Sequence, residues 1–145
     1  GLAYQVNAGL DPLGDTSLVE ISAACGTEKL PELVGEILSI LTELRDQPVQ
    51  ADELTKAKRR YARDLEAGFD DVEGLCAWFG DSMLFGRPLR SPVQRYRRMA
   101  RVKTGHVQSV ANAILRPERL VGTAVGSFTP TLVRKTQALF RAFRS

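Results

Sequence analysis

Histidine is the scarcest of the chemically active residues in this chain of 145 residues, which contains only His106. A three-ligand catalytic zinc site needs several His, Cys or carboxylate ligands at fixed spacing, and no H-x-x-H, H-E-x-x-H or H-x-x-E-H motif occurs. The sequence also lacks a G-x-S-x-G nucleophile elbow, a phosphate-binding G-x-x-x-x-G-K-S/T loop and a G-x-G-x-x-G turn. We therefore expect no metal site on this chain and no enzyme activity from it alone.

Cysteine and long apolar runs are also scarce. The two cysteines, Cys25 and Cys76, form no C-x-x-C pair and lie in apolar patterns, so we expect each to be a small buried thiol. No apolar stretch approaches the roughly 20 residues that cross a bilayer. The sequence predicts no membrane span. It leaves the compartment unknown, with a bacterial cytoplasm or periplasm as the expectation.

Acidic residues are missing from one long stretch, between Asp81 and Glu118, in which the cations accumulate. The eight cations are Arg87, Arg90, Arg95, Arg97, Arg98, Arg101, Lys103 and Arg116. Such a patch suits nucleic acid, but half of it falls on the polar face of a predicted amphipathic helix, and no nucleic-acid module or Gly-aromatic RNA signature occurs. We expect a solvated helix face and no nucleic-acid partner, with nucleic-acid binding as the alternative.

A clear alternation of apolar and polar residues is present at the start of the chain. Leu2, Tyr4, Val6, Ala8 and Leu10 share one face of a predicted strand with that face buried. A second alternating run covers residues 18–25, and the turn formers Asp11, Pro12, Gly14 and Asp15 separate the two. The pattern predicts an antiparallel hairpin. Since only Gly1 precedes the first strand, we expect this chain to be a piece of a longer protein.

Apolar residues at helical spacing predict six helices after the hairpin, near residues 30–44, 51–65, 70–86, 91–102, 104–115 and 129–143. In the third of them we expect an inward stripe of Val72, Leu75, Cys76, Phe79 and Met83. Residues 120–127 carry β-branched residues and glycines, which predict a third strand. The predicted order is β-β-α-α-α-α-α-β-α. It indicates an α+β fold of one domain, residues 1–145, with helices on one face of an antiparallel sheet.

Several short segments occur together in an order that is characteristic of one protein family. They are GLAYQV with its D-x-x-G-D turn, LPELVGEILSILTEL, ADELTKAKRRYARDLEAGFDD, WFGDSMLFGRP and VKTGHVQSVANAILRPERLVGTAVG. Over residues 1–126 they resemble the second half of one unit of the inverzincin zinc metallopeptidases, the family of pitrilysin, insulinase and the mitochondrial processing peptidase. By this resemblance the chain is the C-terminal part of a peptidase unit.

The resemblance implies a larger assembly and its chemistry. Such units pair around a chamber, and an H-x-x-E-H helix in the first half of one unit holds zinc for the hydrolysis of peptides. That half is absent from this sequence, so zinc is expected as a cofactor of the parent protein only. The implied partners are the N-terminal half of the same unit, a homologous second unit and a peptide substrate. The implied function is that of chamber wall and substrate support in a zinc endopeptidase.

Tyr4 is the one residue to which the resemblance gives a site role. It stands where the family has a Tyr that, with a preceding Arg, helps bind the substrate carbonyl in the partner's active site. A phenolic hydroxyl is able to donate a hydrogen bond to a developing oxyanion. The alternative is a strand residue whose ring packs and whose hydroxyl meets water.

Other residues have simpler interpretations, and other roles remain open for the whole chain. We interpret His106 as a surface or capping residue, and Trp78 as part of a packed core or a domain interface rather than a substrate site.

The chief alternative to peptidase function is a non-catalytic structural or partner subunit of the same family. A homo-oligomer formed through an exposed sheet edge is a further alternative.

Overall fold

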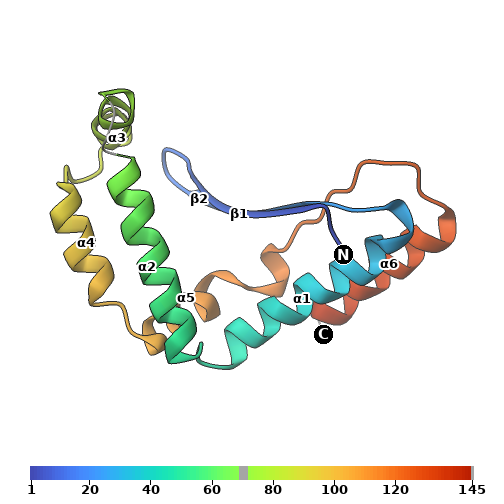
Figure 1. The fold of residues 1–145 in the computed structure, drawn as a ribbon. Helices are drawn as coiled ribbons and strands as arrows, with labels where there is room; N and C mark the ends of the chain where they lie inside the picture. The colour runs from blue at the N-terminus through green and yellow to red at the C-terminus, as the bar shows by residue number, and fades with distance from the viewer. Residues whose placement is uncertain (69–71, 145) are drawn as a thin grey trace. The chain divides into compact units, whose positions relative to one another are not determined.

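The fold combines a strand hairpin with a series of helices. The computed structural model describes residues 1–68 and 72–144, and in that part it contains two strands, six α-helices and two short 3-10 helices (Figure 1). The strands come first and pair antiparallel, so the α+β prediction is confirmed. No helix among the described residues combines the length and the apolar character needed to cross a membrane.

The chain divides into two compact units, which are described separately. The first contains residues 1–47 and 108–145, and the second contains residues 48–107. The expectation that residues 1–145 form a single domain stays a prediction.

The hairpin of the first unit consists of β1 (Gln5–Pro12) and β2 (Ser17–Ala24). Its register sets Val6 opposite Ala23 and Leu10 opposite Val19, so the apolar residues share one face as their alternation predicts. The prediction that this face is buried is wrong. Val6 is 54% exposed and Leu10 is 64% exposed, because strand pairing covers the edges of two strands and not their faces.

The core of the first unit lies between α1 (Leu30–Asp46) and α6 (Pro130–Arg144), which run side by side (Figure 1). The short helix η1 (Thr27–Lys29) leads into α1, whose first turn carries Pro31, a residue that lacks the N–H a helix start leaves unpaired. Leu33 and Leu38 are buried in α1, at 6% and 7% exposure. The burial of these apolar side chains stabilises the unit, and Leu139 of α6 lies 3.8 Å from where a Cβ on Gly35 of α1 would be.

The C-terminal end of α1 is held by the second half of α5 (Thr104–Ile114). The last carbonyl groups of a helix have no partner within the helix. Asn112 Nδ2 donates to the Arg45 carbonyl at 2.8 Å, and Gln108 Nε2 donates to the Asp46 carbonyl at 3.2 Å. Ala111, between them, is 3% exposed. Two side-chain hydrogen bonds and the buried Ala111 thus hold the second half of α5 in the first unit.

Residues 120–127 do not form the predicted third strand. After α5 and the short helix η2 (Pro117–Arg119), the chain is extended but pairs with neither strand of the hairpin. Gly122 lies instead against the ring of Phe140 in α6, where an added Cβ would overlap the ring. The glycine therefore permits a close approach to an aromatic side chain and not to another strand.

The second unit contains α2 (Ala51–Ala67), α3 (Val72–Leu84) and α4 (Pro92–Ala100). α2 and α4 run side by side, and Lys58 Nζ donates to the Ala100 carbonyl at 2.9 Å. α4 begins with the predicted capping box: Ser91 Oγ accepts from the Gln94 N–H, and the Gln94 side chain accepts from the Ser91 N–H. All six predicted helices are present.

The apolar stripe of α3 is more open than its spacing predicts. Val72 is 76% exposed and Met83 is 71% exposed, so the inward placement predicted for them is wrong. The prediction of two buried thiols is also wrong: Cys76 is exposed, Cys25 is half-buried, and both are free. Helical spacing fixes which residues share a face, but burial also needs a second surface to cover that face.

Gly122 gives the first test of this packing. We expect Gly122→Ala to lower the free energy of unfolding by about 1–3 kcal/mol, because the new methyl group overpacks against Phe140. The control is Gly9→Ala in β1, where nothing lies within 4 Å of an added Cβ. Urea denaturation of the three proteins provides the comparison. Equal destabilisation by the two substitutions would contradict the close approach.

Asp46 gives a test by pH. A hydrogen bond from Arg45 Nε at 2.7 Å lowers the pKa of Asp46, and partial desolvation opposes this effect. Because the folded pKa lies below the ordinary value of about 3.9, the contact stabilises the fold above that pH, and this contribution is lost as the pH falls through the folded pKa. We expect Arg45→Gln to raise the Asp46 midpoint in an NMR carboxyl titration. An unchanged midpoint would exclude this cause.

Candidate functional site

Tyr4 lies just ahead of β1 and has a fixed backbone with an open side chain. Its N–H donates to the Ala24 carbonyl at 2.7 Å, which extends the hairpin ladder by one bond. Its side chain is 86% exposed, and its hydroxyl lies close to Gly26, 3.8 Å from where a Cβ on that residue would be. The phenol is therefore accessible to a bound molecule. Its role toward a substrate carbonyl stays a prediction.

The part of the chain that the structure describes contains no set of side chains that could bind a metal ion. No group of three His, Cys, Asp or Glu side chains there is placed to hold a metal ion. Asp11 lies at the end of β1 and Asp15 in the hairpin turn. Asp70 and Asp71, which are adjacent in the sequence, lie outside the described residues.

His106 has a structural position at the start of α5. Its Nδ1 accepts a hydrogen bond from the Lys103 N–H at 3.3 Å. The first N–H groups of a helix region lack intrahelical partners, so a side-chain acceptor here is a cap. The interpretation of His106 as a capping residue is confirmed.

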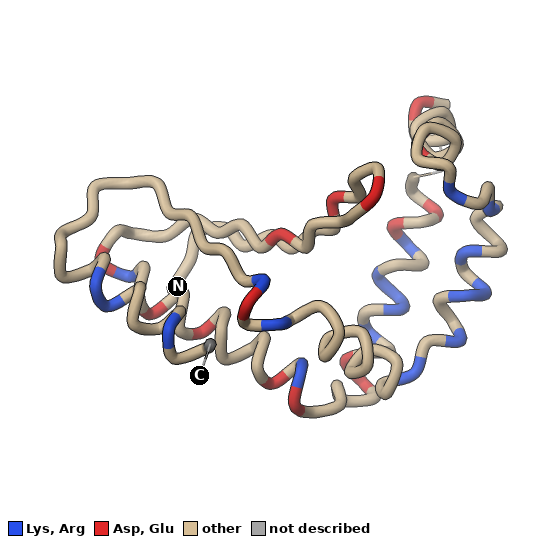
Figure 2. Tube along the Cα trace, turned by 180° about the vertical axis from the view of Figure 1, so that it is seen from behind, with Lys and Arg blue, Asp and Glu red and all other residues tan. Residues whose placement is uncertain are grey.

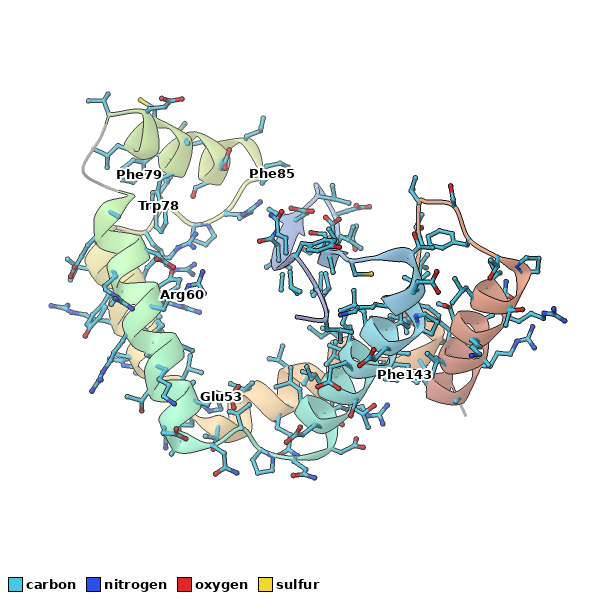
Figure 3. All side chains as sticks on the ribbon, turned by 45° about the vertical axis from the view of Figure 1, so that its right-hand side comes forward. Glu53, Arg60, Trp78, Phe79, Phe85 and Phe143 are labelled. Carbon is cyan, nitrogen blue, oxygen red and sulfur yellow. The ribbon has the colours of Figure 1, made fainter. Side chains whose placement is uncertain are left out.

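Trp78 links α3 to the loop ahead of α4 (Figure 3). Its indole Nε1 donates to the Arg90 carbonyl at 3.0 Å, and the Arg95 guanidinium lies over its ring at 4.2 Å from the centroid. Ser82, which is 4% exposed, donates from Oγ to the Trp78 carbonyl at 2.9 Å. Trp78 is half-buried and packs within its own unit, which supports the packing interpretation over a substrate site.

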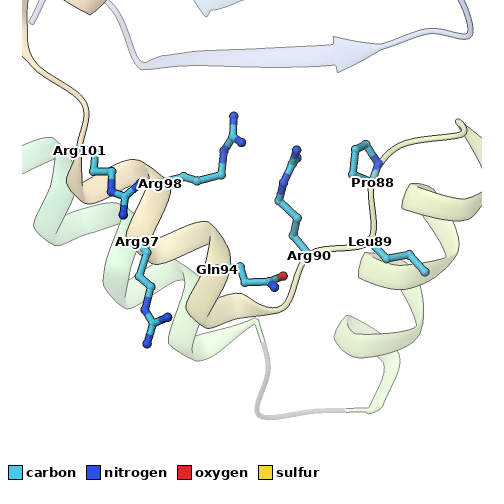
Figure 4. A pocket seen from close by; sticks show the side chains of 7 residues that line it. All are labelled: Pro88, Leu89, Arg90, Gln94, Arg97, Arg98 and Arg101. Carbon is cyan, nitrogen blue, oxygen red and sulfur yellow. The ribbon is translucent and has the colours of Figure 1, made fainter.

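The basic stretch forms a defined surface on the second unit. We call it the α4 basic surface: an open hollow lined by Pro88, Leu89, Arg90, Gln94, Arg97, Arg98 and Arg101 (Figure 4). Arg97, Arg98 and Arg101 are exposed, and Arg90 is half-buried. Basic residues recur along α2 and α4 in Figure 2. The sequence located these cations correctly, but it did not indicate that they would line one hollow with two apolar residues.

Trp78→Phe tests how the loop ahead of α4 is held. The substitution keeps an aromatic ring under Arg95 but removes the indole donor, so we expect a loss of about 1 kcal/mol in the free energy of unfolding. Hydrogen exchange at residues 87–91 should accelerate at the same time. Phe79→Leu, at a position 39% exposed, is the control and should leave that exchange unchanged. Unchanged loop exchange in both variants would contradict the assignment.

Comparison with known families finds a match in the first part of the chain. The model of the family described as the peptidase M16 inactive domain matches residues 1–61, which cover the hairpin, α1 and part of α2. Among curated proteins, none matches the chain. The match confirms the resemblance drawn from the sequence over residues 1–61, which are similar to the inactive domain of the peptidase M16 family.

Proposed function

We propose that this chain is a non-catalytic part of a zinc-dependent endopeptidase, in which it forms chamber wall and contacts the peptide substrate. The observation that carries the proposal is the match of residues 1–61 to an inactive peptidase domain. The exposed apolar face of the hairpin supports it. Val6, Leu10 and Val19 are 54%, 64% and 46% exposed, and a surface of this kind is typical of an interface.

Zinc in this proposal belongs to another unit. Zinc bound by such a unit would activate a water molecule and polarise the scissile carbonyl group. The described residues of this chain offer no ligand set for it, so we assign no zinc step to them. In this proposal the chain contributes a paired hairpin, the accessible phenol of Tyr4, and a surface for the zinc-bearing half and the second unit.

Tyr4 is proposed to donate a hydrogen bond to the substrate carbonyl as negative charge develops on it. The backbone bond to Ala24 fixes where the side chain leaves the hairpin, and its exposure leaves the hydroxyl free to reach another molecule. Removing one donor of this type elsewhere costs about 2.7–4 kcal/mol, which corresponds to roughly 10²–10³ in kcat. Tyr4 is therefore the residue whose loss should affect turnover without affecting folding.

The test is Tyr4→Phe in the parent protein assembled with its zinc-bearing unit. We expect kcat for an internally quenched peptide to fall about 10²–10³-fold, with unchanged zinc content and unchanged thermal stability. Tyr96→Phe on α4, which removes the hydroxyl of a side chain 47% exposed, is the matched control and should retain full activity. Zinc content measured by elemental analysis separates loss of metal from loss of the donor.

The alternative function is that of a structural subunit in an assembly without peptidase activity. The inactive character of the matching family model is the observation that favours it. It predicts an assembly that contains no stoichiometric zinc and does not cleave peptides. An assembly that binds zinc and cleaves peptides, but is insensitive to Tyr4→Phe, would retain the peptidase proposal and return Tyr4 to a packing role.

A further inference from the structure

The α4 basic surface carries charge that the described part of the chain does not neutralise. On α2, Lys56 pairs with Asp52 at 3.1 Å and Arg60 with Asp64 at 3.7 Å. None of the ion pairs and side-chain hydrogen bonds among the described residues involves the side chains of Arg90, Arg97, Arg98 or Arg101. Two neighbouring arginines do have partners: Arg87 lies over the ring of Phe85, and Arg95 lies over the ring of Trp78. The four arginines of the hollow are available to an external anion.

The frame of this surface is fixed before any ligand arrives. The bond from Trp78 Nε1 to the Arg90 carbonyl holds the loop, and the capping box at Ser91 holds the first turn of α4. Because the loop and the helix start are already held in place, less conformational entropy is lost when a ligand binds. Figure 4 shows the side chains of Arg90 and Arg98 extending in the same direction from the loop and the helix.

The chemistry of the hollow indicates the class of anion. A guanidinium binds a carboxylate or a phosphate through two parallel hydrogen bonds. Pro88 and Leu89 add apolar surface, with Leu89 57% exposed, and Gln94 adds an amide that is able to bond a peptide group. This combination of charge, apolar contact and amide suits a polypeptide, which offers all three features along one chain.

We propose that the α4 basic surface binds a short acidic segment of a polypeptide in extended conformation. Carboxylates at every second residue of an extended chain lie on one face about 6.6 Å apart. Arg97 and Arg101 are one helical turn apart, about 5–6 Å at Cβ, so long side chains span the difference. The inference goes beyond the proposed peptidase role and does not depend on zinc chemistry.

Nucleic acid fits this surface less well. The nine residues of α4 extend only about 14 Å, a length that reaches few phosphates. The hollow contains Pro88 and Leu89 and no aromatic ring on which a base could stack.

The experiment measures fluorescence anisotropy of a labelled peptide of about eight residues that alternates Glu with Ser, titrated with the intact chain at low salt. We expect saturable binding that weakens steeply with added salt. Replacing three exposed arginines, Arg97→Gln, Arg98→Gln and Arg101→Gln together, should weaken it at least about tenfold. The control removes the same charge from α2, by Arg59→Gln, Arg60→Gln and Arg63→Gln, and should change affinity less than about twofold.

Four results would overturn the inference. They are equal weakening by the two triple variants, equal binding of a matched Gln–Ser peptide, tighter binding of a single-stranded oligonucleotide of equal charge, and no binding of the acidic peptide. Circular dichroism checks that each variant is folded. If the α4 triple variant is not folded, Arg98→Gln alone takes its place. Because no protease assay is involved, failure here leaves the peptidase proposal intact, and failure of Tyr4→Phe leaves this one intact.

Discussion

The end of α1 is the constraint on which the first unit depends. The backbone carbonyls of Arg45 and Asp46 need partners that the helix itself does not supply, and the side chains of Gln108 and Asn112 provide them. The Arg45 guanidinium meanwhile lies 5.7 Å from the ring centroid of Phe143 in α6. One helix end thus contacts α5 through its carbonyls and α6 through a side chain. Segments more than 60 residues apart in sequence meet there.

Around that constraint the interior is small. The buried apolar side chains among the described residues are Leu33, Leu38 and Ala111. Large apolar side chains on the hairpin and on α3 remain open to solvent, including Leu10, Val72 and Met83. Isolated two-stranded hairpins are marginally stable, and open apolar faces are costly in water. The proposal that this chain is part of a larger assembly rests in part on these exposed apolar side chains.

The two proposed binding sites, Tyr4 and the α4 basic surface, differ in how they are built. Tyr4 relies on the backbone: the hairpin ladder fixes its position and leaves its hydroxyl free. The α4 basic surface relies on side chains, since an indole donor and a capping box fix a loop from which arginines project. The first suits a single hydrogen bond to one substrate atom. The second suits several carboxylates recognised together.

The sequence by itself determined most of the helices and strands and the family resemblance of the first part of the chain. Alternation predicted the antiparallel hairpin, helical spacing and caps predicted all six helices, and the resemblance to M16 peptidases was confirmed over residues 1–61. These signals are local, because each depends on residues a few positions apart. They also located Tyr4 and the arginines, which are visible as residue types in a pattern.

Only the tertiary structure decided burial and pairing. Residues 120–127 have the composition of a strand, yet Gly122 lies against Phe140, since an extended segment becomes a strand only where another strand accepts its hydrogen bonds. Cys76 and Val72 share the predicted stripe of α3, yet both are exposed, because amphipathicity does not specify what covers a face. The hollow on α4 needed Pro88 and Leu89 beside the arginines, a juxtaposition set by the loop that Trp78 holds.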